Sequence, residues 1–491
     1  MTTNIYIEHA SGAAYPQWDA KACYGPDAIY PEFSSESGEI VLSQENKVYE
    51  MVRNTIAGLG MDSEHFGTCD WNPFQDFIAQ GETVLIKPNM VCHYNGDKRY
   101  GTDCLVTHPA IVRAVLDYVV LALNGSGRII LADAPVQSCD FEVLVKELHY
   151  DGLVDYFQNN GISVELMDLR QLDEVYLQSL SHNACFTAKN EDVTVSIGED
   201  SAFCSRKDMK KTADKLRITN YLPEHMREYH DEDKHMYSVA KAVLEADVII
   251  NLPKPKTHRK AGMTASLKNM VGCVAKKECL PHHTKGSKAE QGDEYLKKSV
   301  FKRWRTALEE KNDRLVAKGR KKSGLIGLVQ IFLYKASKVS HADVYAEGSW
   351  YGNDTLWRTI CDICRVVMYA DKTGAMQPKQ QRKMLILADM IVSGEGEGPL
   401  CPSPKPVGIL LGGWEQIAVD KVIAALMGFD SEHFPSIKNA NLGKEYRLPD
   451  STAEISSNNP VFHKKSRQEI KKKVVPFLPT SGWKECLEES I

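Results

Sequence analysis

The chain has 491 residues, of which 43% are hydrophobic, so it can bury a large core and form two or three domains. Its 60 Lys and Arg against 65 Asp and Glu leave a net charge of −5, which excludes the overall positive charge typical of nucleic-acid-binding proteins. The opening stretch MTTNIYIEHASG has neither a basic nor an apolar region, and the 13 Cys are scattered. We therefore expect no signal peptide and a cytoplasmic protein with reduced thiols.

Strands alternate with helices along most of the chain. Apolar runs predict strands at 83–89, 127–135, 162–169, 248–253, 384–392 and 407–411. The segments between them predict helices at 107–123, 141–161, 236–247 and 415–428. Continuous apolar strands joined by helices are typical of a parallel sheet that is covered on both faces. We expect an α/β fold with a largely parallel sheet, helices on both faces and Rossmann-like layers.

Changes in composition suggest the domain organisation. We expect an N-terminal lead segment at 1–79, an α/β core at 80–435 and a polar C-terminal tail at 436–491 that packs on the core. Within the core, a mixed polar insertion, irregular or β-rich, is predicted at 170–235, and a basic helical insertion at 280–345. The second insertion ends in the apolar run 324–339, which is too short to span a bilayer.

The segment NLPKPKTHRKAGMTASLKNMVG (251–272) places many positive charges directly after a predicted buried strand. Alternate side chains of an extended segment share a face, so Lys254, Lys256 and His258 are expected to point the same way. After Gly262 a short helix is predicted, which carries Lys268 and Asn269 and whose free N–H groups favour an anion. Ligands of parallel sheets bind at the carboxyl ends of strands, so the segment predicts an anion site. The alternative is a solvated basic loop.

The strand at 83–89 ends in a similar pattern. Lys87 and Asn89 flank a proline in IKPN, and two such strand ends can converge on one anionic group. We expect both residues to bind substrate. The alternative is a simple turn.

An acidic pattern follows the strand at 384–392. In VSGEGEGP, Glu395 and Glu397 alternate with glycines, which allow close approach of the backbone. Their carboxylates are candidates for divalent metal ligands or for general acid–base catalysis. A glycine-rich turn with two exposed Glu is the alternative. Asp420 lies inside a predicted helix, where a structural role is favoured.

Other patterns carry less chemistry. Cys361 and Cys364 form a CxxC inside a predicted helix, which favours packing over redox chemistry. His282 and His283 are adjacent and can contact a ligand, but such a pair is unusual as metal ligands. The chain has no iron–sulfur cluster motif, P-loop, dinucleotide-binding fingerprint or nucleophile elbow.

Four blocks together resemble a known family. VLIKPN, ADVIINLPKPKTHRKAGMTASLKNMVG, ILADMIVSGEGEGP and AVDKVIAALMGFD, in this order, are similar to proteins with the DUF362 domain. KLRITNYLPEHMREYH, LPHHTKGS and EGSWYGNDTLWRTI are similar to a bacterial subfamily without the fused ferredoxin-type cluster domain of some members. The family's activity is largely unassigned. If the last of these blocks belongs to the site, the resemblance adds Asn353, Asp354 and Arg358, and a guanidinium binds phosphate or carboxylate in a bidentate manner.

Three functional hypotheses follow. The leading one is an enzyme of unassigned reaction that acts on a small phosphorylated or carboxylated substrate, with or without a divalent metal. In it, His258, Glu395 and Glu397 are catalytic, and the last two are also the candidate metal ligands. The substrate is bound by Lys87, Asn89, Lys254, Lys256, Lys268, Asn269 and Arg358. The second is a non-catalytic protein that docks to a membrane surface or a partner through residues 302–322 and the apolar run up to 339. The third is a redox metal protein related to the cluster-bearing members.

Overall fold

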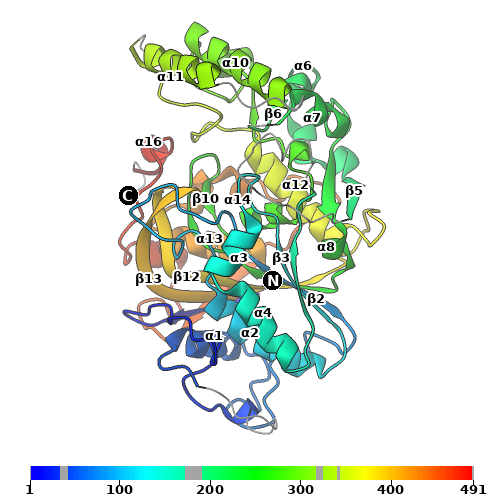
Figure 1. Ribbon diagram of the computed structural model, residues 1–491, viewed down its shortest axis with the longest axis vertical. Coiled ribbons are helices and arrows are strands. Elements are labelled where there is room, and N and C mark those ends of the chain that lie inside the picture. The colour runs from blue at the N-terminus through cyan, green and yellow to red at the C-terminus, as the bar shows by residue number, and fades with distance from the viewer. Residues whose placement is uncertain are drawn as a thin grey trace.

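The computed structural model describes residues 2–33, 42–171, 191–219, 221–316, 324–339 and 343–488. Within them a ten-stranded sheet forms the centre of the molecule (Figure 1). Eight strands lie side by side in the order β14 (Thr452–Ser457), β1 (Thr2–His9), β13 (Cys401–Gly413), β12 (Lys383–Glu397), β8 (Val248–Leu252), β2 (Thr83–Pro88), β3 (Arg128–Asp133) and β4 (Val164–Asp168). The short strands β9 (Lys256–His258) and β10 (Gly262–Thr264) form a hairpin beside β12.

The sheet is largely parallel, as predicted. Of the eight strands, only β13 runs against its neighbours β12 and β1. The pairs β12–β8, β8–β2, β2–β3, β3–β4 and β1–β14 are all parallel. The α/β fold class is confirmed.

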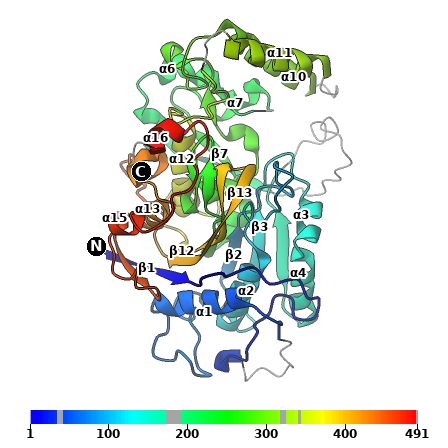
Figure 2. The ribbon, with the colours of Figure 1, turned by 90° about the vertical axis from the view of Figure 1, so that its left-hand side faces the viewer.

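Both faces of the sheet are buried, which explains why its strands are apolar without interruption. Val248 and Ile250 pack into one core and Ile249 into the other, because successive side chains of a strand point to opposite faces. The first core is covered by α1 (Lys47–Gly58), α2 (Pro109–Leu123), α3 (Phe141–Glu147) and α4 (Tyr150–Asn159). The second is covered by α8 (Lys241–Glu245), α12 (Leu356–Tyr369) and α13 (Gln416–Leu426). Figure 2 shows α3 and α4 on one side of the sheet and α13 on the other.

Two predicted helices differ from the structure. The helix predicted at 141–161 is divided into α3 and α4, because His149 adopts a left-handed conformation (φ +60°) and stacks on Trp18. The helix predicted at 236–247 begins as a strand, β7 (Met236–Ala240), and only its second half is helical, as α8. The strand β7 pairs with β5 (Asp192–Ser196), which the local pattern could not reveal.

The two predicted insertions have different architectures. The described part of 170–235 combines the strands β5 and β6 (Leu216–Arg217) with the helices α6 (Met209–Thr212) and α7 (Pro223–Tyr229), whereas residues 172–190 lie outside the described residues. In 280–345, β11 (His283–Thr284) pairs with β6 and is followed by α10 (Val300–Val316) and α11 (Gly324–Val339). These two helices pack on each other and form one end of the molecule (Figures 1 and 2). No helix in the described part of the chain combines the length and the apolar character needed to cross a membrane.

The lead segment and the tail both contribute to the central sheet. The lead segment supplies β1, and the tail supplies β14, which pairs with β1 in parallel. Three short helices complete the tail: α14 (Pro435–Lys438), α15 (Arg467–Lys471) and α16 (Lys484–Glu488). The predicted boundaries at 79 and 435 therefore do not separate independent sheets.

Candidate functional site

A pocket of about 430 Å³ lies at the carboxyl ends of β2, β3 and β8. From these ends come Asn89, Asp133 with the loop that follows it, and Lys256 and His258 of β9. The order of the strands reverses here, because the chain passes from β2 to β3 and β4 and then returns to place β8 on the other side of β2. Such a switch point is where open α/β sheets bind their ligands.

A chain of side-chain hydrogen bonds fixes one wall of the pocket. Asn269 donates to Asn251 (2.8 Å), and Asn89 donates to Asn269 (2.9 Å). At the end of the chain, the Nζ atom of Lys256 donates to Asn89 Oδ1 (2.7 Å). Each amide is thereby held in one orientation, and the buried ammonium group is fixed in the pocket wall.

Positive charge dominates the pocket. Its cationic lining residues are Lys256, Arg259, Lys260, Lys268 and Lys277. The only acidic side chain among its described lining residues is Asp133, which already forms an ion pair with Lys87 (2.6 Å). No described residue accepts a hydrogen bond from the Nζ atom of Lys268, which leaves that donor for a ligand.

The pKa values of these lysines reflect their burial. Burial lowers the pKa of Lys260, Lys268 and Lys277 from 10.5 to about 8 in each case. Burial and the neighbouring Lys254 lower the pKa of Lys256 well below its ordinary value. An anion in the pocket would reverse these shifts, because it stabilises the charged form of each lysine.

Two histidines line the pocket in opposite tautomers. His258 Nδ1 accepts hydrogen bonds from the backbone N–H groups of Lys260 and Ala261 (both 3.1 Å), so the proton of its neutral ring is on Nε2. His282 Nδ1 donates to the carbonyl of Leu280 (2.8 Å), so its Nε2 is the unprotonated atom. Burial lowers the pKa of both rings well below the ordinary value, and the charge of Lys268 acts in the same direction. The pocket therefore offers one neutral imidazole donor and one neutral imidazole acceptor.

The structure brings together only part of the predicted site. Asn89, Lys256, His258, Lys268 and Asn269 line the pocket. Lys87 and Lys254 lie outside its lining, since each is fully buried in an ion pair, with Asp133 (2.6 Å) and with Asp389 (2.9 Å) respectively. Arg358 also lies outside the lining, where it forms an ion pair with Asp354 (3.1 Å) and donates to Ser205. Asn353 accepts from the N–H groups of Thr355 and Leu356, where α12 begins, and so has a structural contact.

Glu395 and Glu397 contact the tail. Glu395 accepts from the backbone N–H of Leu478 (3.0 Å) and pairs with Lys405 (3.3 Å), while Glu397 accepts from the N–H of Ser481 (2.7 Å). They lie on β12, which continues as a hairpin with β13 through both residues instead of ending in a glycine-rich turn. The turn that follows them does reach the pocket, through Pro399 and Leu400. A metal at the two carboxylates stays a prediction.

The predicted anion site at a helix N-terminus is occupied by a side chain. The helix after Gly262 is the short α9 (Ser266–Asn269), and its first N–H groups donate to Asp420 (2.7 and 3.1 Å). Burial raises the pKa of this carboxyl to about 7. Asp420 thus has the structural role expected of it, and these N–H groups are not open to a ligand.

Several lining residues were missed by the sequence analysis. Lys260 lies within the basic segment but was not assigned to the site, and Lys277 follows a few residues after it. His282 was noted only as one of an adjacent pair. Asp133 lies within the predicted strand 127–135 and ends the observed β3, and its position next to Lys87 follows from the parallel pairing of β2 with β3. The sequence did contain a signal for Asp133: its carboxylate follows one apolar run, and Lys87-Pro88 ends another.

Comparisons with known proteins place the chain in a family. A Thermotoga maritima protein of known structure matches this chain with 11% sequence identity. The match covers 73% of this chain and 54% of that protein, but its TM-score of 0.27 carries no structural argument. A thylakoid-associated protein of Synechocystis sp. is 30% identical over 222 residues, which is 45% of this chain and 48% of that protein, so the similarity spans about half the length of the relative. The family described as "Domain of unknown function (DUF362)" matches residues 84–198 and 190–425. These matches include every strand end of the pocket, and the chain belongs to the DUF362 family.

Proposed function

We propose that the protein is an enzyme that binds a small phosphorylated or carboxylated substrate in this pocket and moves a proton to or from it. The observation that carries the proposal is the set of five cationic side chains around one cavity whose only acidic lining residue, among those described, is already paired. A volume of about 430 Å³ suits a small metabolite. Buried lysines without a carboxylate partner are costly, and an anionic ligand offsets that cost.

The two histidines supply the chemistry in this proposal. His282 Nε2 is the general base, because it is unprotonated at neutral pH and lines the pocket. His258 is a hydrogen-bond donor through Nε2 and polarises a substrate oxygen, since its Nδ1 is committed to two backbone N–H groups. This assignment gives His258 an electrophilic role and moves the basic role to His282. Lys256 and Lys268 hold the anionic group.

Glu395 and Glu397 have no part in this mechanism. Both carboxylates bind backbone N–H groups of the tail, and neither lines the pocket. The proposal therefore requires no divalent metal at this position. The leading hypothesis from the sequence combined the anion site with the acidic pair, and experiments can now test these two parts separately.

The test combines binding with proton exchange. Calorimetric titration with phosphate and with a panel of small phosphorylated and carboxylated metabolites identifies ligands, and NMR in D₂O then follows the exchange of their C–H hydrogens. We expect at least one ligand to exchange, and His282→Gln to abolish the exchange while it leaves the affinity within a few-fold. Absence of binding across the panel, or full exchange by His282→Gln, would overturn the proposal.

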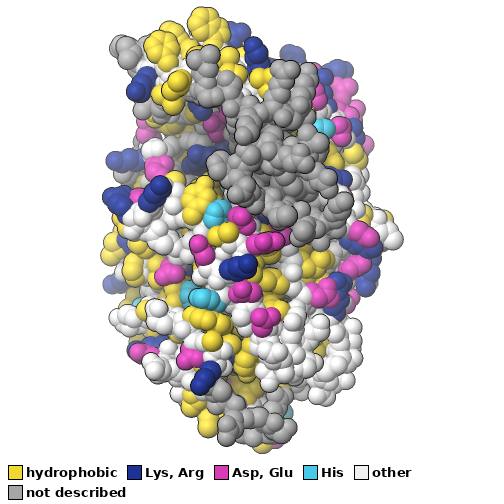
Figure 3. Space-filling model, in the orientation of Figure 1, with side chains coloured by type: hydrophobic (Ala, Val, Ile, Leu, Met, Phe, Trp, Pro, Cys, Tyr) yellow, Lys and Arg dark blue, Asp and Glu magenta, His cyan; other side chains and the backbone are white. Residues whose placement is uncertain are grey.

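A second candidate function is docking of the α10–α11 hairpin to a membrane surface. Trp304, Leu328 and Phe332 are 57%, 66% and 67% exposed, which is high for large hydrophobic side chains. Figure 3 shows hydrophobic side chains next to Lys and Arg at this end of the molecule. The Synechocystis relative is named as thylakoid-associated, which fits such a contact.

The electrostatic part of this candidate is limited. Lys302, Arg305 and Arg314 of α10 are paired with carboxylates, and residues 317–322 of the basic run lie outside the described residues. Docking of the hairpin to a membrane would therefore rest mainly on its exposed apolar side chains. Flotation with anionic vesicles tests it: we expect the wild type to float and the Leu328→Asp/Phe332→Asp variant to remain in solution. Equal behaviour of the two proteins would contradict it.

A further inference from the structure

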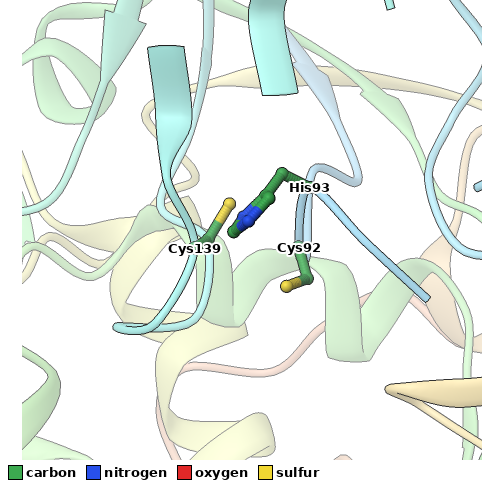
Figure 4. A group of neighbouring side chains, drawn as sticks. All are labelled: Cys92, His93 and Cys139. Carbon is green, nitrogen blue, oxygen red and sulfur yellow. The ribbon is translucent and has the colours of Figure 1, made fainter. Parts of the chain in front are cut away.

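A second cluster of reactive side chains lies next to the pocket wall. Cys92, His93 and Cys139 come from the loops that follow β2 and β3, and their candidate ligand atoms all lie within 4.8 Å of one another (Figure 4). The two loops are joined by a hydrogen bond from the N–H of Val136 to the carbonyl of Val91 (3.0 Å), and both valines line the pocket. The cluster therefore sits behind the wall that these loops form.

We propose that Cys92, His93 and Cys139 bind a thiophilic divalent cation, Zn²⁺ by its ligand chemistry, which clamps the two loops of the pocket wall. Two thiolates and one imidazole are a set of three protein ligands that Zn²⁺ accepts, with a water in the fourth position. Sulfur ligands disfavour Mg²⁺ and Ca²⁺, which prefer oxygen. This site is separate from the predicted metal site at Glu395 and Glu397.

The loop that carries Cys139 is held in place by a buried arginine. Arg170 is fully buried and forms a forked ion pair with Asp168, whose shortest contact is 2.6 Å. Its Nη1 atom donates to the carbonyls of Val136 (2.9 Å) and Cys139 (3.1 Å). A ligand set on a braced loop loses little conformational freedom when a metal binds, which favours affinity.

The charges of the ligands suit a divalent cation. Cys92 and Cys139 bind a metal as thiolates, so binding releases the proton of each thiol. The two negative charges then neutralise the two positive charges of the cation.

His93 is the weakest of the three ligands. Its Nδ1 accepts from the N–H of Asp140 (2.9 Å), so Nδ1 carries the lone pair and faces the loop of Cys139. Ligation through Nδ1 exchanges this hydrogen bond for a metal bond, which reduces the net gain. We therefore expect His93→Ala to lower metal affinity less than Cys92→Ser or Cys139→Ser does.

The test uses Co²⁺ as a spectroscopic probe in the full chain, reduced and stripped of metal under anaerobic conditions. We expect one Co²⁺ per chain with a thiolate-to-metal charge-transfer band, and displacement of the band by Zn²⁺. The band should disappear in Cys92→Ser/Cys139→Ser and persist in Cys69→Ser/Cys204→Ser, a control that removes two exposed thiols. The affinity of Cys92→Ser/Cys139→Ser for Co²⁺ should fall by more than ~10–100-fold, which is the cost of losing a residue that only supports a metal ligand. No band in the wild type, or an equal band in both variants, overturns the proposal.

A second measurement guards against a variant that does not fold. X-ray absorption of the Zn²⁺-loaded wild type counts its ligands directly, and two sulfur neighbours support the site, whereas a shell of only oxygen and nitrogen overturns it. Formation of a Cys92–Cys139 disulfide in the presence of stoichiometric Zn²⁺ and air would also overturn the proposal, because metal-bound thiolates resist oxidation. Phosphate binding is also measured in the Cys92→Ser/Cys139→Ser variant. This measurement tests the anion pocket separately, so a failure of the metal site can be distinguished from a failure of the proposed function.

Discussion

Lys254 and Lys256 lie two positions apart, and both are fully buried, yet their environments differ. Lys254 pairs with Asp389 at 2.9 Å and contacts the Tyr15 hydroxyl, whereas Lys256 meets the amide oxygen of Asn89 and a backbone carbonyl. The first charge is neutralised inside the protein, and the second is not. The two lysines therefore differ in whether a carboxylate neutralises them, and the carboxylate partner of Lys254 lies far away in sequence.

The largest expected effect is on stability and concerns the paired lysine. Lys254→Met leaves Asp389 as a buried charge without its cationic partner, so we expect the free energy of unfolding to fall by about 3–5 kcal/mol. Lys256→Met removes a buried charge with no carboxylate partner but leaves the Asn89 oxygen without its donor, so we expect a smaller loss of about 1–3 kcal/mol. Urea denaturation measures both. Equal losses in the two variants would remove the distinction between the lysines.

The next effect is on ligand binding. Lys268→Gln removes a cation that no described residue binds, and hydrogen bonds to charged groups are worth about 1.5–3 kcal/mol, so affinity for the best anionic ligand should fall ~10–150-fold. Calorimetry measures this loss. Lys210→Gln is the matched control, because its side chain is 84% exposed and lies outside the pocket lining. A similar loss in the control would indicate a general charge effect.

The third prediction concerns pH. Lys260, Lys268 and Lys277 have pKa values of about 8, below the 10.5 expected in the unfolded chain. Between pH 8 and 10.5 the unfolded chain binds more protons, so without an anion these groups make stability rise with pH across that window. An anion requires the protonated lysines, so its stabilising effect should be full below pH 8 and lost above it. Melting temperatures with and without sulfate at pH 7 and 9.5 measure this; an equal increment at both values would contradict it.

The smallest effect is expected at the acidic hairpin. Glu395→Gln weakens one partly exposed ion pair and one hydrogen bond to the tail, so unfolding free energy should change by no more than about 1 kcal/mol. Ligand affinity should stay within two-fold, as measured in the same titration. A loss comparable to that of Lys268→Gln would return Glu395 to the site.

Local patterns were sufficient for six of the eight strands that lie side by side in the central sheet, all except β1 and β14, and for part of the pocket. Uninterrupted apolar runs identified β2, β3, β4 and β8, because burial on both faces of a parallel sheet requires them. The position of Asn89, Lys256 and His258 at the pocket followed from the rule that ligands bind at the carboxyl ends of strands. These inferences needed only neighbouring residues.

The remaining features depend on contacts between distant residues. Asp389 lies 135 positions from Lys254, and nothing near Lys254 predicts the ion pair. The segment of β7 was predicted to be helical from its local pattern. Its pairing with β5, a separate segment, makes it a strand. Cys92 and Cys139 are 47 positions apart and have no metal-binding spacing, so only the pairing of β2 with β3 brings them together. Such contacts follow from the topology of the fold, which local sequence patterns do not reveal.

The pairing of β1 with β13 and β14 has a consequence for biosynthesis. Asn458 binds the backbone of His9 across 449 positions, so β1 has no neighbour in the central sheet until almost the whole chain has been made. During translation it stays an unpaired edge that other chains can join, and contacts of such high sequence separation form slowly. A chain that ends before residue 400 would therefore lack both neighbours of β1.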